Sequence, residues 1–395
     1  MIVFQFLPPF KRTSGFVFCI AFFFLLNITQ TSAQQTLNAV SFQSYGIDNG
    51  LSQGFVSDIV QDNKGFMWFA TGDGLNRYDG YNFVVYHHEP DHANTLISDD
   101  LTCVYQDVKG RIWIGTRNSG IDLFNPETNT FEHFHHTDGP SLHSNSILQI
   151  SGDESGAIWI KTRDGIERIQ LFAGPAASRT KGSTKVPYHA EFIPVQIDRQ
   201  TELHKKKSAP QGLFIDSRNR IFITTTDKIW QVFFNAKTNK YKLTERYKFA
   251  SSDNAFVPQL LEDKAGKRLL LNNRDIIQFA DYEFNDPKKI YSYDAYQIRT
   301  VIDREQNLWL SNNNKITLLN LKTGNVQNLI SNIPDQSLAI SAVTDFYCDK
   351  TGVVWIGSGG YGLLKYDPEA ELFHHIFPGE AVYQLLTDQG NNIYT

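Results

Sequence analysis

Asp107-Val-Lys-Gly-Arg-Ile-Trp-Ile-Gly-Thr116 is one copy of a pattern that recurs along the whole chain: an aspartate, usually a glycine three positions later, and a large apolar residue six positions after the aspartate. The aspartates of the eight copies are Asp62, Asp107, Asp153, Asp216, Asp263, Asp303, Asp349 and Asp388. Their apolar partners are Trp68, Trp113, Trp159, Phe222, Leu269, Trp309, Trp355 and Tyr394. Successive aspartates lie 39 to 47 residues apart, except for one interval of 63, and such a period indicates a repeat architecture.

Each repeat predicts four short strands. Asp-x-x-Gly is typical of a tight turn, because Asp bonds its own backbone two residues on and Gly tolerates positive φ. The apolar runs on either side, residues 101–105 and 111–116 in the second copy, predict a hairpin, and two further apolar runs follow. A four-stranded sheet of this size cannot bury both faces alone. The sequence therefore predicts an all-β fold, a seven-bladed β-propeller of four-stranded antiparallel blades with the large apolar residue packed between neighbouring sheets.

The repeats also predict where the ring begins and ends. Residues 39–45 resemble the outer strand of a blade, and we expect them to complete the seventh blade and close a ring over about residues 38–370. Residues 371–395 predict the start of a further blade or second propeller, so we expect this chain to be the front part of a longer protein. Blades four and five are degraded copies, and the long interval holds an insertion at about 173–211, either a solvated loop or a binding element.

Composition is that of an ordinary globular protein, with 41% apolar and 20% charged residues and a net charge of −5, and it offers no basic face for nucleic acid. At the N-terminus, Lys11 and Arg12 precede an apolar run at 16–28 and small residues at 31–33. This pattern predicts a secretory signal peptide over residues 1–33 and a periplasmic location, with an uncleaved anchor as the alternative. Cys103 and Cys348 are predicted to be buried free thiols.

Candidate functional residues are few. Eight aspartates at one structural position cannot all be catalytic, so we predict no catalytic residues and assign the aspartates to turns. Nine of the eleven histidines lie on or just after outer strands, but adjacent residues at a strand end point to opposite faces, so we predict no metal site and no cofactor. Ligands of propellers usually contact loops at one mouth of the channel. The candidates there are Arg117, Arg163 and Tyr361, which are able to hold sugar hydroxyls or carboxylates.

The consensus Asp-x-x-Gly-x-Ile-Trp-Ile-Gly-Thr resembles the two-component regulator propeller repeat. The opening residues 45–52, 60–68 and 74–80 resemble the start of the periplasmic sensor region of hybrid two-component system histidine kinases of Bacteroidetes. The resemblance implies further sensor repeats, a membrane helix and a kinase beyond these residues, an inner-membrane parent that forms a homodimer, and a response to glycan fragments that controls polysaccharide utilisation.

The leading hypothesis is thus an exported ligand-sensing module, with an oligosaccharide as its ligand and no enzymatic activity. One alternative is a propeller enzyme resembling the streptogramin lyases, whose repeats share Asp-x-x-Gly-x-Ile-Trp. Another is a structural scaffold or a non-functional truncated fragment. No His, Glu and metal set is evident in the sequence for the lyase alternative.

Overall fold

The computed structural model describes residues 36–39, 42–136, 142–173, 188–194, 210–235, 240–250, 257–272, 274–293, 298–312, 315–330, 334–369, 386–387 and 393–394. The predicted signal peptide lies outside the described residues. So do His374, His375, Asp388 and most of the predicted eighth repeat. Only the short strands β30 (Leu386–Thr387) and β31 (Ile393–Tyr394) of that repeat are described, and they pair with each other.

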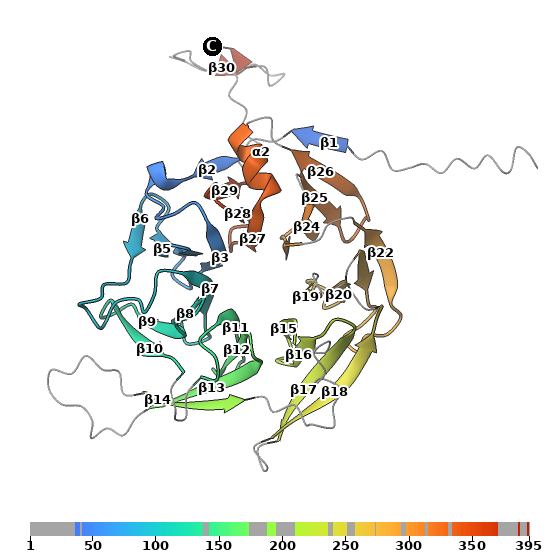
Figure 1. Ribbon diagram of the computed structural model, residues 1–395. Coiled ribbons are helices and arrows are strands. Elements are labelled where there is room, and N and C mark those ends of the chain that lie inside the picture. Colours follow the sequence, from blue (N-terminus) through green and yellow to red (C-terminus); the bar gives the residue numbers. More distant parts are fainter. Residues whose placement is uncertain are drawn as a thin grey trace, which may run out of the picture. The chain divides into compact units, whose positions relative to one another are not determined.

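Seven antiparallel sheets are arranged radially around a central opening, which confirms the predicted seven-bladed propeller (Figure 1). Blade one contains β3 (Val56–Gln61), β4 (Met67–Thr71), β5 (Gly74–Tyr78) and β6 (Phe83–Tyr86). Blade two contains β7 (Leu101–Gln106), β8 (Ile112–Thr116), β9 (Ile121–Asn125) and β10 (Thr130–Phe134). Blade three contains β11 (Ile147–Gly152), β12 (Ile158–Thr162), β13 (Ile166–Ala173) and β14 (Tyr188–Pro194). The outer strand β14 therefore falls inside the stretch that the sequence predicts as an insertion.

The remaining blades follow the same order from the centre outward. Blade four contains β15 (Gly212–Ile215), β16 (Ile221–Thr224), β17 (Lys228–Asn235) and β18 (Lys240–Lys248). Blade five contains β19 (Gln259–Glu262), β20 (Arg268–Leu271), β21 (Asp275–Gln278) and β22 (Lys288–Ser292). Blade six contains β23 (Thr300–Ile302), β24 (Asn307–Asn312), β25 (Lys315–Asn320) and β26 (Val326–Ile330), with β1 (Thr36–Ala39) as a fifth strand beside β26. Blade seven contains β27 (Val343–Cys348), β28 (Val354–Ser358) and β29 (Leu363–Tyr366).

A strand from the N-terminal side completes the seventh blade, as the sequence predicts. β2 (Gln43–Tyr45) pairs antiparallel with β29, and Tyr45 lies opposite Leu363. The helix α2 (Pro334–Ser341), which the sequence analysis did not predict, helps to hold this junction. The buried Gln336 amide of α2 donates to the Phe42 carbonyl at 2.6 Å and accepts from the Phe42 N–H at 3.2 Å. The ring is therefore closed by strand pairing and by a side-chain amide.

The repeated aspartate does more than form a turn. Its Oδ1 accepts backbone N–H bonds from the residues that follow, as Asp62 does from Lys64 and Phe66. Its Oδ2 accepts the indole N–H of the partner tryptophan at 2.8 to 3.0 Å in all five copies that have one. Each tryptophan is buried and packs against the next blade; Trp68, for example, shares a core cluster with Leu101 and Val104. The pattern therefore links a turn, a buried hydrogen bond and the contact between blades.

Blade four keeps the aspartate but has Phe222 in place of tryptophan, and two arginines supply the missing donors. Arg220 Nε donates to Asp216 Oδ2 at 2.8 Å, and the fully buried Arg268 of blade five reaches the same oxygen. The Arg268 guanidinium carbon lies 4.4 Å from the centre of the Phe222 ring. Burial opposes ionisation of Asp216, but these hydrogen bonds outweigh it and lower the pKa of the carboxyl. In blade four, arginine side chains thus replace the indole as hydrogen-bond donors to the buried carboxylate of Asp216.

The innermost strands are joined by side chains around the channel. Thr102 Oγ1 donates to the Ile147 carbonyl of blade three at 2.8 Å, and Ser57 Oγ donates to the Leu101 carbonyl of blade two at 2.9 Å. At the junction of blades seven and one, the Ile59 N–H donates to Asp345 Oδ2 at 3.1 Å.

Two carboxyl groups meet at this junction. Burial raises the pKa of Asp58 to about 6, although N–H groups of Val104 and Ile59 donate to it. Burial and the neighbouring Asp58 raise the pKa of Asp345 further, with Arg299 opposing the rise. The pair therefore retains a proton at a pH where ordinary aspartates are ionised.

Replacing Trp68 by Phe is expected to cost more stability than replacing Trp113 by Phe. Both changes remove the indole N–H and similar volume, but Asp107 Oδ2 keeps the Arg111 Nε bond at 2.6 Å. Among the described residues, Asp62 Oδ2 accepts a hydrogen bond from Trp68 alone. An unsatisfied buried acceptor adds about 1–3 kcal/mol. Urea unfolding of the two variants measures the difference, and equal losses would contradict this role of the indole bond.

The Asp58–Asp345 pair is expected to make stability fall as pH rises. Both folded pKa values lie above the unfolded value, so the contribution is complete below about pH 4 and is lost as pH rises through about 6 and beyond. Asp345→Asn, which carries no titratable carboxyl at this position, should become more stable relative to the unaltered protein as pH rises from 5 to 8. Unfolding free energies at several pH values test this, with Asp335→Asn, at an exposed position of α2, as the control; parallel curves would refute it.

Candidate ligand-binding site

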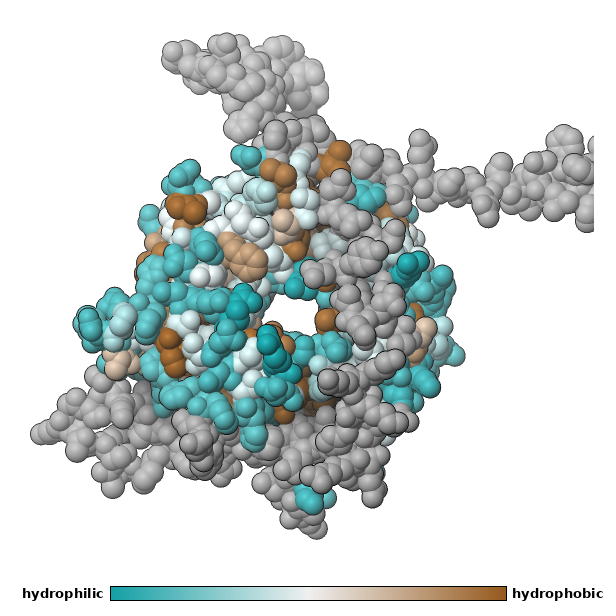
Figure 2. All heavy atoms as spheres, in the orientation of Figure 1, coloured by the Kyte–Doolittle hydropathy of each residue, from teal (hydrophilic) through white to brown (hydrophobic). Residues whose placement is uncertain are grey.

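Two sets of loops lie together on one face of the ring, which we call the loop face: the turns between second and third strands and the connections from each outer strand to the next blade. Gly74 N–H donates to the Asp99 carbonyl at 2.8 Å, and Gly120 N–H donates to the Asn145 carbonyl at 3.0 Å. Gly74 has φ of +95°, and a Cβ there would lie 2.5 Å from the Tyr86 carbonyl, so the close approach requires glycine. Figure 2 shows the opening along the ring axis, bordered by hydrophilic and hydrophobic residues.

The three predicted channel-mouth residues lie on this face in different blades. Arg117 of blade two is half exposed and donates from Nε to Asp100 at 2.8 Å. Arg163 of blade three is exposed, and Tyr361 of blade seven has 44% of its surface exposed. Among the described residues, no contact joins the three side chains. Their role in binding remains a prediction.

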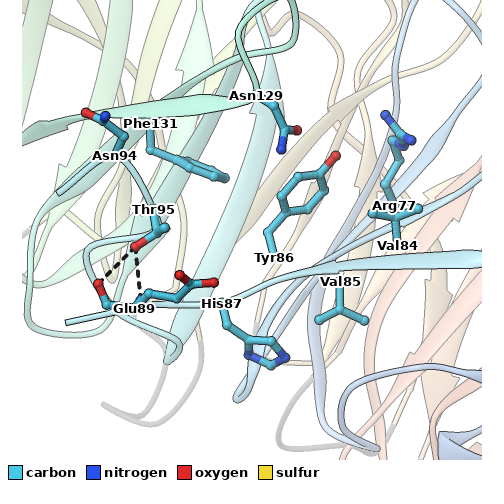
Figure 3. A pocket seen from close by; sticks show the side chains of 10 residues that line it. All are labelled: Arg77, Val84, Val85, Tyr86, His87, Glu89, Asn94, Thr95, Asn129 and Phe131. Atoms are coloured by element: carbon cyan, nitrogen blue, oxygen red, sulfur yellow. Dashed lines mark hydrogen bonds between the residues drawn. The ribbon is translucent and has the colours of Figure 1, made fainter. Parts of the chain in front are cut away.

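A groove of about 350 Å³ lies at the rim between blades one and two (Figure 3). Its walls come from β5, β6, β10 and the connection that leads from β6 to blade two. The lining residues are Arg77, Val84, Val85, Tyr86, His87, Glu89, Asn94, Thr95, Asn129 and Phe131. The rings of Tyr86 and Phe131, largely buried, meet edge to face with centroids 5.9 Å apart. Sequence analysis did not identify this groove.

The connection between β6 and β7 is held firmly against blade two. The Phe131 N–H donates to the Asn94 carbonyl at 2.9 Å, and Glu89 N–H donates to Thr95 Oγ1 at 2.9 Å. A polar residue inside β9 holds the other end, because the buried Asp122 accepts the Ile97 N–H at 2.9 Å. Because these walls are already ordered, the protein loses less conformational entropy when a ligand binds.

The histidine pairs have a structural role in these connections. His88 Nδ1 lies 2.6 Å from the Leu96 carbonyl, and His136 Nδ1 lies 2.5 Å from the Leu142 carbonyl, so the second histidine of each of these two described pairs fastens a neighbouring loop. The first histidine of the first pair, His87, is half exposed, with Nδ1 3.5 Å from Asp99 and 4.0 Å from Asp73. These three side chains are close enough to share a cation, but Asp73 is half exposed and Asp99 partly exposed, and exposed acidic groups of this kind are common without an ion.

Hydrogen bonds favour the protonated form of His133 beneath the same connection. Its Nδ1 lies 2.7 Å from Asp122 Oδ1 and its Nε2 lies 2.9 Å from the Ala93 carbonyl, so both ring nitrogens face acceptors. The hydrogen bond to Asp122 raises the pKa of His133 against the opposing effect of burial. Burial raises the pKa of Asp122, with His133 opposing that rise. The sequence signal for this network is a polar residue at one position of successive third strands: Asn76, Asp122 and Glu167.

The described residues define one seven-bladed propeller ring, with connecting loops gathered on one face and a groove at its rim. Its repeats are of the predicted kind: the sequence model of the family described as "Two component regulator propeller" matches residues 50–73 and 95–118. Among curated proteins, histidine kinase P4 of Formosa agariphila is 39% identical over 80 residues, which are 20% of this chain and 6% of that protein.

Solved structures agree on the fold. The extracellular domain of BT3049 from B. thetaiotaomicron, assigned to a hybrid two-component system, matches with a TM-score of 0.61 and 22% identity over 82% of this chain and 41% of that chain. Virginiamycin B lyase from Staphylococcus aureus matches with a TM-score of 0.56 and 13% identity over 82% of this chain and 98% of that chain. The chain therefore spans less than half of that extracellular domain and a small fraction of the curated kinase. In the described part of the chain, no helix is long and apolar enough to cross a membrane.

His133→Leu is expected to loosen the connection over residues 89–97. The change removes both ring hydrogen bonds and leaves Asp122 buried with one fewer partner, so exchange of these amides should accelerate by at least about tenfold, which corresponds to about 1.4 kcal/mol. Hydrogen exchange with mass spectrometry measures this. His143→Leu, which acts on Glu167 in blade three at 3.1 Å, is the matched control and should leave residues 89–97 unchanged. Equal protection in both variants would refute the role of His133.

Proposed function

We propose that this propeller is an extracytoplasmic ligand-sensing module of a two-component signalling protein, without catalytic activity of its own, and that its ligand is a glycan fragment. The observation that carries the proposal is the agreement of the seven-bladed ring with the extracellular domain of BT3049, together with two matched two-component regulator propeller repeats. The similarity to a histidine kinase supports a kinase region of the same signalling protein as the partner that receives the signal.

The geometry supports recognition rather than chemistry. Six of the repeated aspartates are buried and accept hydrogen bonds from tryptophan or arginine, so they are not available to a substrate. The groove between blades one and two instead combines aromatic faces with amide, hydroxyl and guanidinium groups, the mixture that small polar ligands require. Signalling would follow if the ligand stabilised one of two arrangements of the sensor domains more than the other.

Glycan binding is expected to raise the thermal stability of the chain. A ligand present at about 100 times its dissociation constant stabilises the folded state by about 2.7 kcal/mol. An array of plant, algal and host oligosaccharides, read by thermal shift and followed by calorimetry of each hit, tests this. Failure of every saccharide on the array to bind would remove the glycan part of the proposal.

A lyase is the second candidate, because virginiamycin B lyase has a similar propeller and matches over nearly its whole length. Incubation with virginiamycin B, read by mass spectrometry for the ring-opened product, separates the two functions. Ring opening that depends on the enzyme concentration would favour the lyase, whereas intact antibiotic beside saccharide binding would favour the sensor.

A further inference from the structure

We propose that the groove between blades one and two binds an acidic saccharide, whose anionic group pairs with Arg77. This inference rests on the proposed sensing function and adds the place and the chemical class of the ligand. It begins with the charge in the groove. Among the described residues, no carboxylate oxygen lies within 4 Å of the Arg77 guanidinium, and Arg77 Nε is buried without a hydrogen-bond partner.

Four other arginines near the repeated aspartates form ion pairs: Arg111, Arg168, Arg220 and Arg268. Arg168 occupies in β13 the position that Arg77 occupies in β5, opposite the repeat tryptophan, and its Nε lies 3.7 Å from Asp153. Arg111 lies 2.6 Å from Asp107. The carboxylate that acts on Arg77 electrostatically, Asp79, is fully exposed and forms no close pair with it. Arg77 is therefore a partly buried cation whose counter-ion is not supplied by the blade.

Arg77 is also held in place before any ligand arrives. Its guanidinium carbon lies 4.9 Å from the centre of the Phe66 ring and 5.9 Å from that of Trp68. Trp68 is in turn fixed by its hydrogen bond to Asp62. A planar guanidinium fixed in this way offers a fork of N–H donors that matches a carboxylate or another oxyanion.

The rest of the groove favours a sugar over a bare anion. The Tyr86 hydroxyl points between the Asn129 amide and Arg77 (Figure 3), so donors and acceptors converge beside the cation. Burial raises the pKa of Tyr86 and the positive charge of Arg77 opposes the rise, so the phenol stays protonated and able to donate. Val84 adds exposed apolar surface beside these polar groups.

The groove is asymmetric in charge. At the end away from Arg77, Glu89 accepts a hydrogen bond at 2.6 Å from His92, and Thr95 and Asn94 offer neutral polar groups. An anion is therefore favoured at the Arg77 end and hydroxyl groups at the Glu89 end. The volume of about 350 Å³ lies at the lower end of the range for small-molecule sites, about 300–1000 Å³, which suits one or two sugar rings.

Calorimetry of the 395-residue chain with digalacturonate and with its methyl ester tests the charge directly, since the two differ in ionisation of the carboxyl group. We expect the acid to bind at least about tenfold more tightly than the ester, because a charge-assisted bond to Arg77 forms with the acid alone. A sulfated N-acetylglucosamine disaccharide beside its unsulfated parent forms a second arm, and the tighter acidic ligand identifies the anionic group.

Arg77→Gln should abolish the preference for the acid, and Arg77→Lys should retain part of it, because lysine keeps the charge and loses the fork. Tyr86→Phe, which preserves the ring, should weaken the binding of both ligands. This variant also keeps the inference testable if Arg77→Gln fails to fold. Arg274→Gln, an exposed arginine of blade five, removes the same net charge far from the groove and should change nothing.

Equal binding of acid and ester, or an acid preference that survives Arg77→Gln, would overturn the inference. A neutral saccharide that binds tightly and ignores Arg77 and Tyr86 would overturn it while leaving the sensing function intact. If no saccharide bound, including those on the array, both the acidic-saccharide inference and the glycan part of the proposed function would be refuted.

Discussion

A buried hydrogen bond from the tryptophan indole to the aspartate Oδ2 organises each regular blade of this propeller. The aspartate must lie six residues before the tryptophan so that its other oxygen can close the turn, as Asp62 does for Lys64 and Phe66. The bond orients the indole plane against the next blade, and radial stacking then covers both faces of each sheet. Turn, strand and blade contact are thereby fixed by one pair of side chains, which explains why the spacing recurs so strictly.

The departures from this rule follow from the same physics. A buried carboxylate without a donor is costly, so loss of the indole in blade four is accompanied by Arg220 and by Arg268 of the neighbouring blade. A cation replaces a neutral donor, and the contact between blades four and five becomes partly ionic. Arg77 is the converse case: it lies opposite Trp68 as Arg168 lies opposite Trp159, but among the described residues it has no ion pair, and it lines a groove instead.

Polar groups inside apolar strands connect the scaffold to its loops. Asp122 interrupts β9, accepts the Ile97 N–H and pairs with His133 beneath the Glu89–Thr95 connection. Second histidines such as His88 fasten the same connections through carbonyl groups. A groove at the rim can therefore be as well ordered as the blades that flank it, although one of its walls is a loop.

The sequence by itself determined the period, the turns, the tryptophan anchors and the closing strand, because each depends on contacts within one repeat or on a repeated pattern. Asn219, which replaces glycine in the blade-four turn, also has the positive φ that the alignment of copies requires. Sequence could not place α2, the strand β14 inside the insertion, the Arg268–Asp216 pair or the Arg77 groove. Each of these joins residues from different blades or a connection whose length varies, so only the tertiary structure decided which side chains meet and which cation was left without a partner.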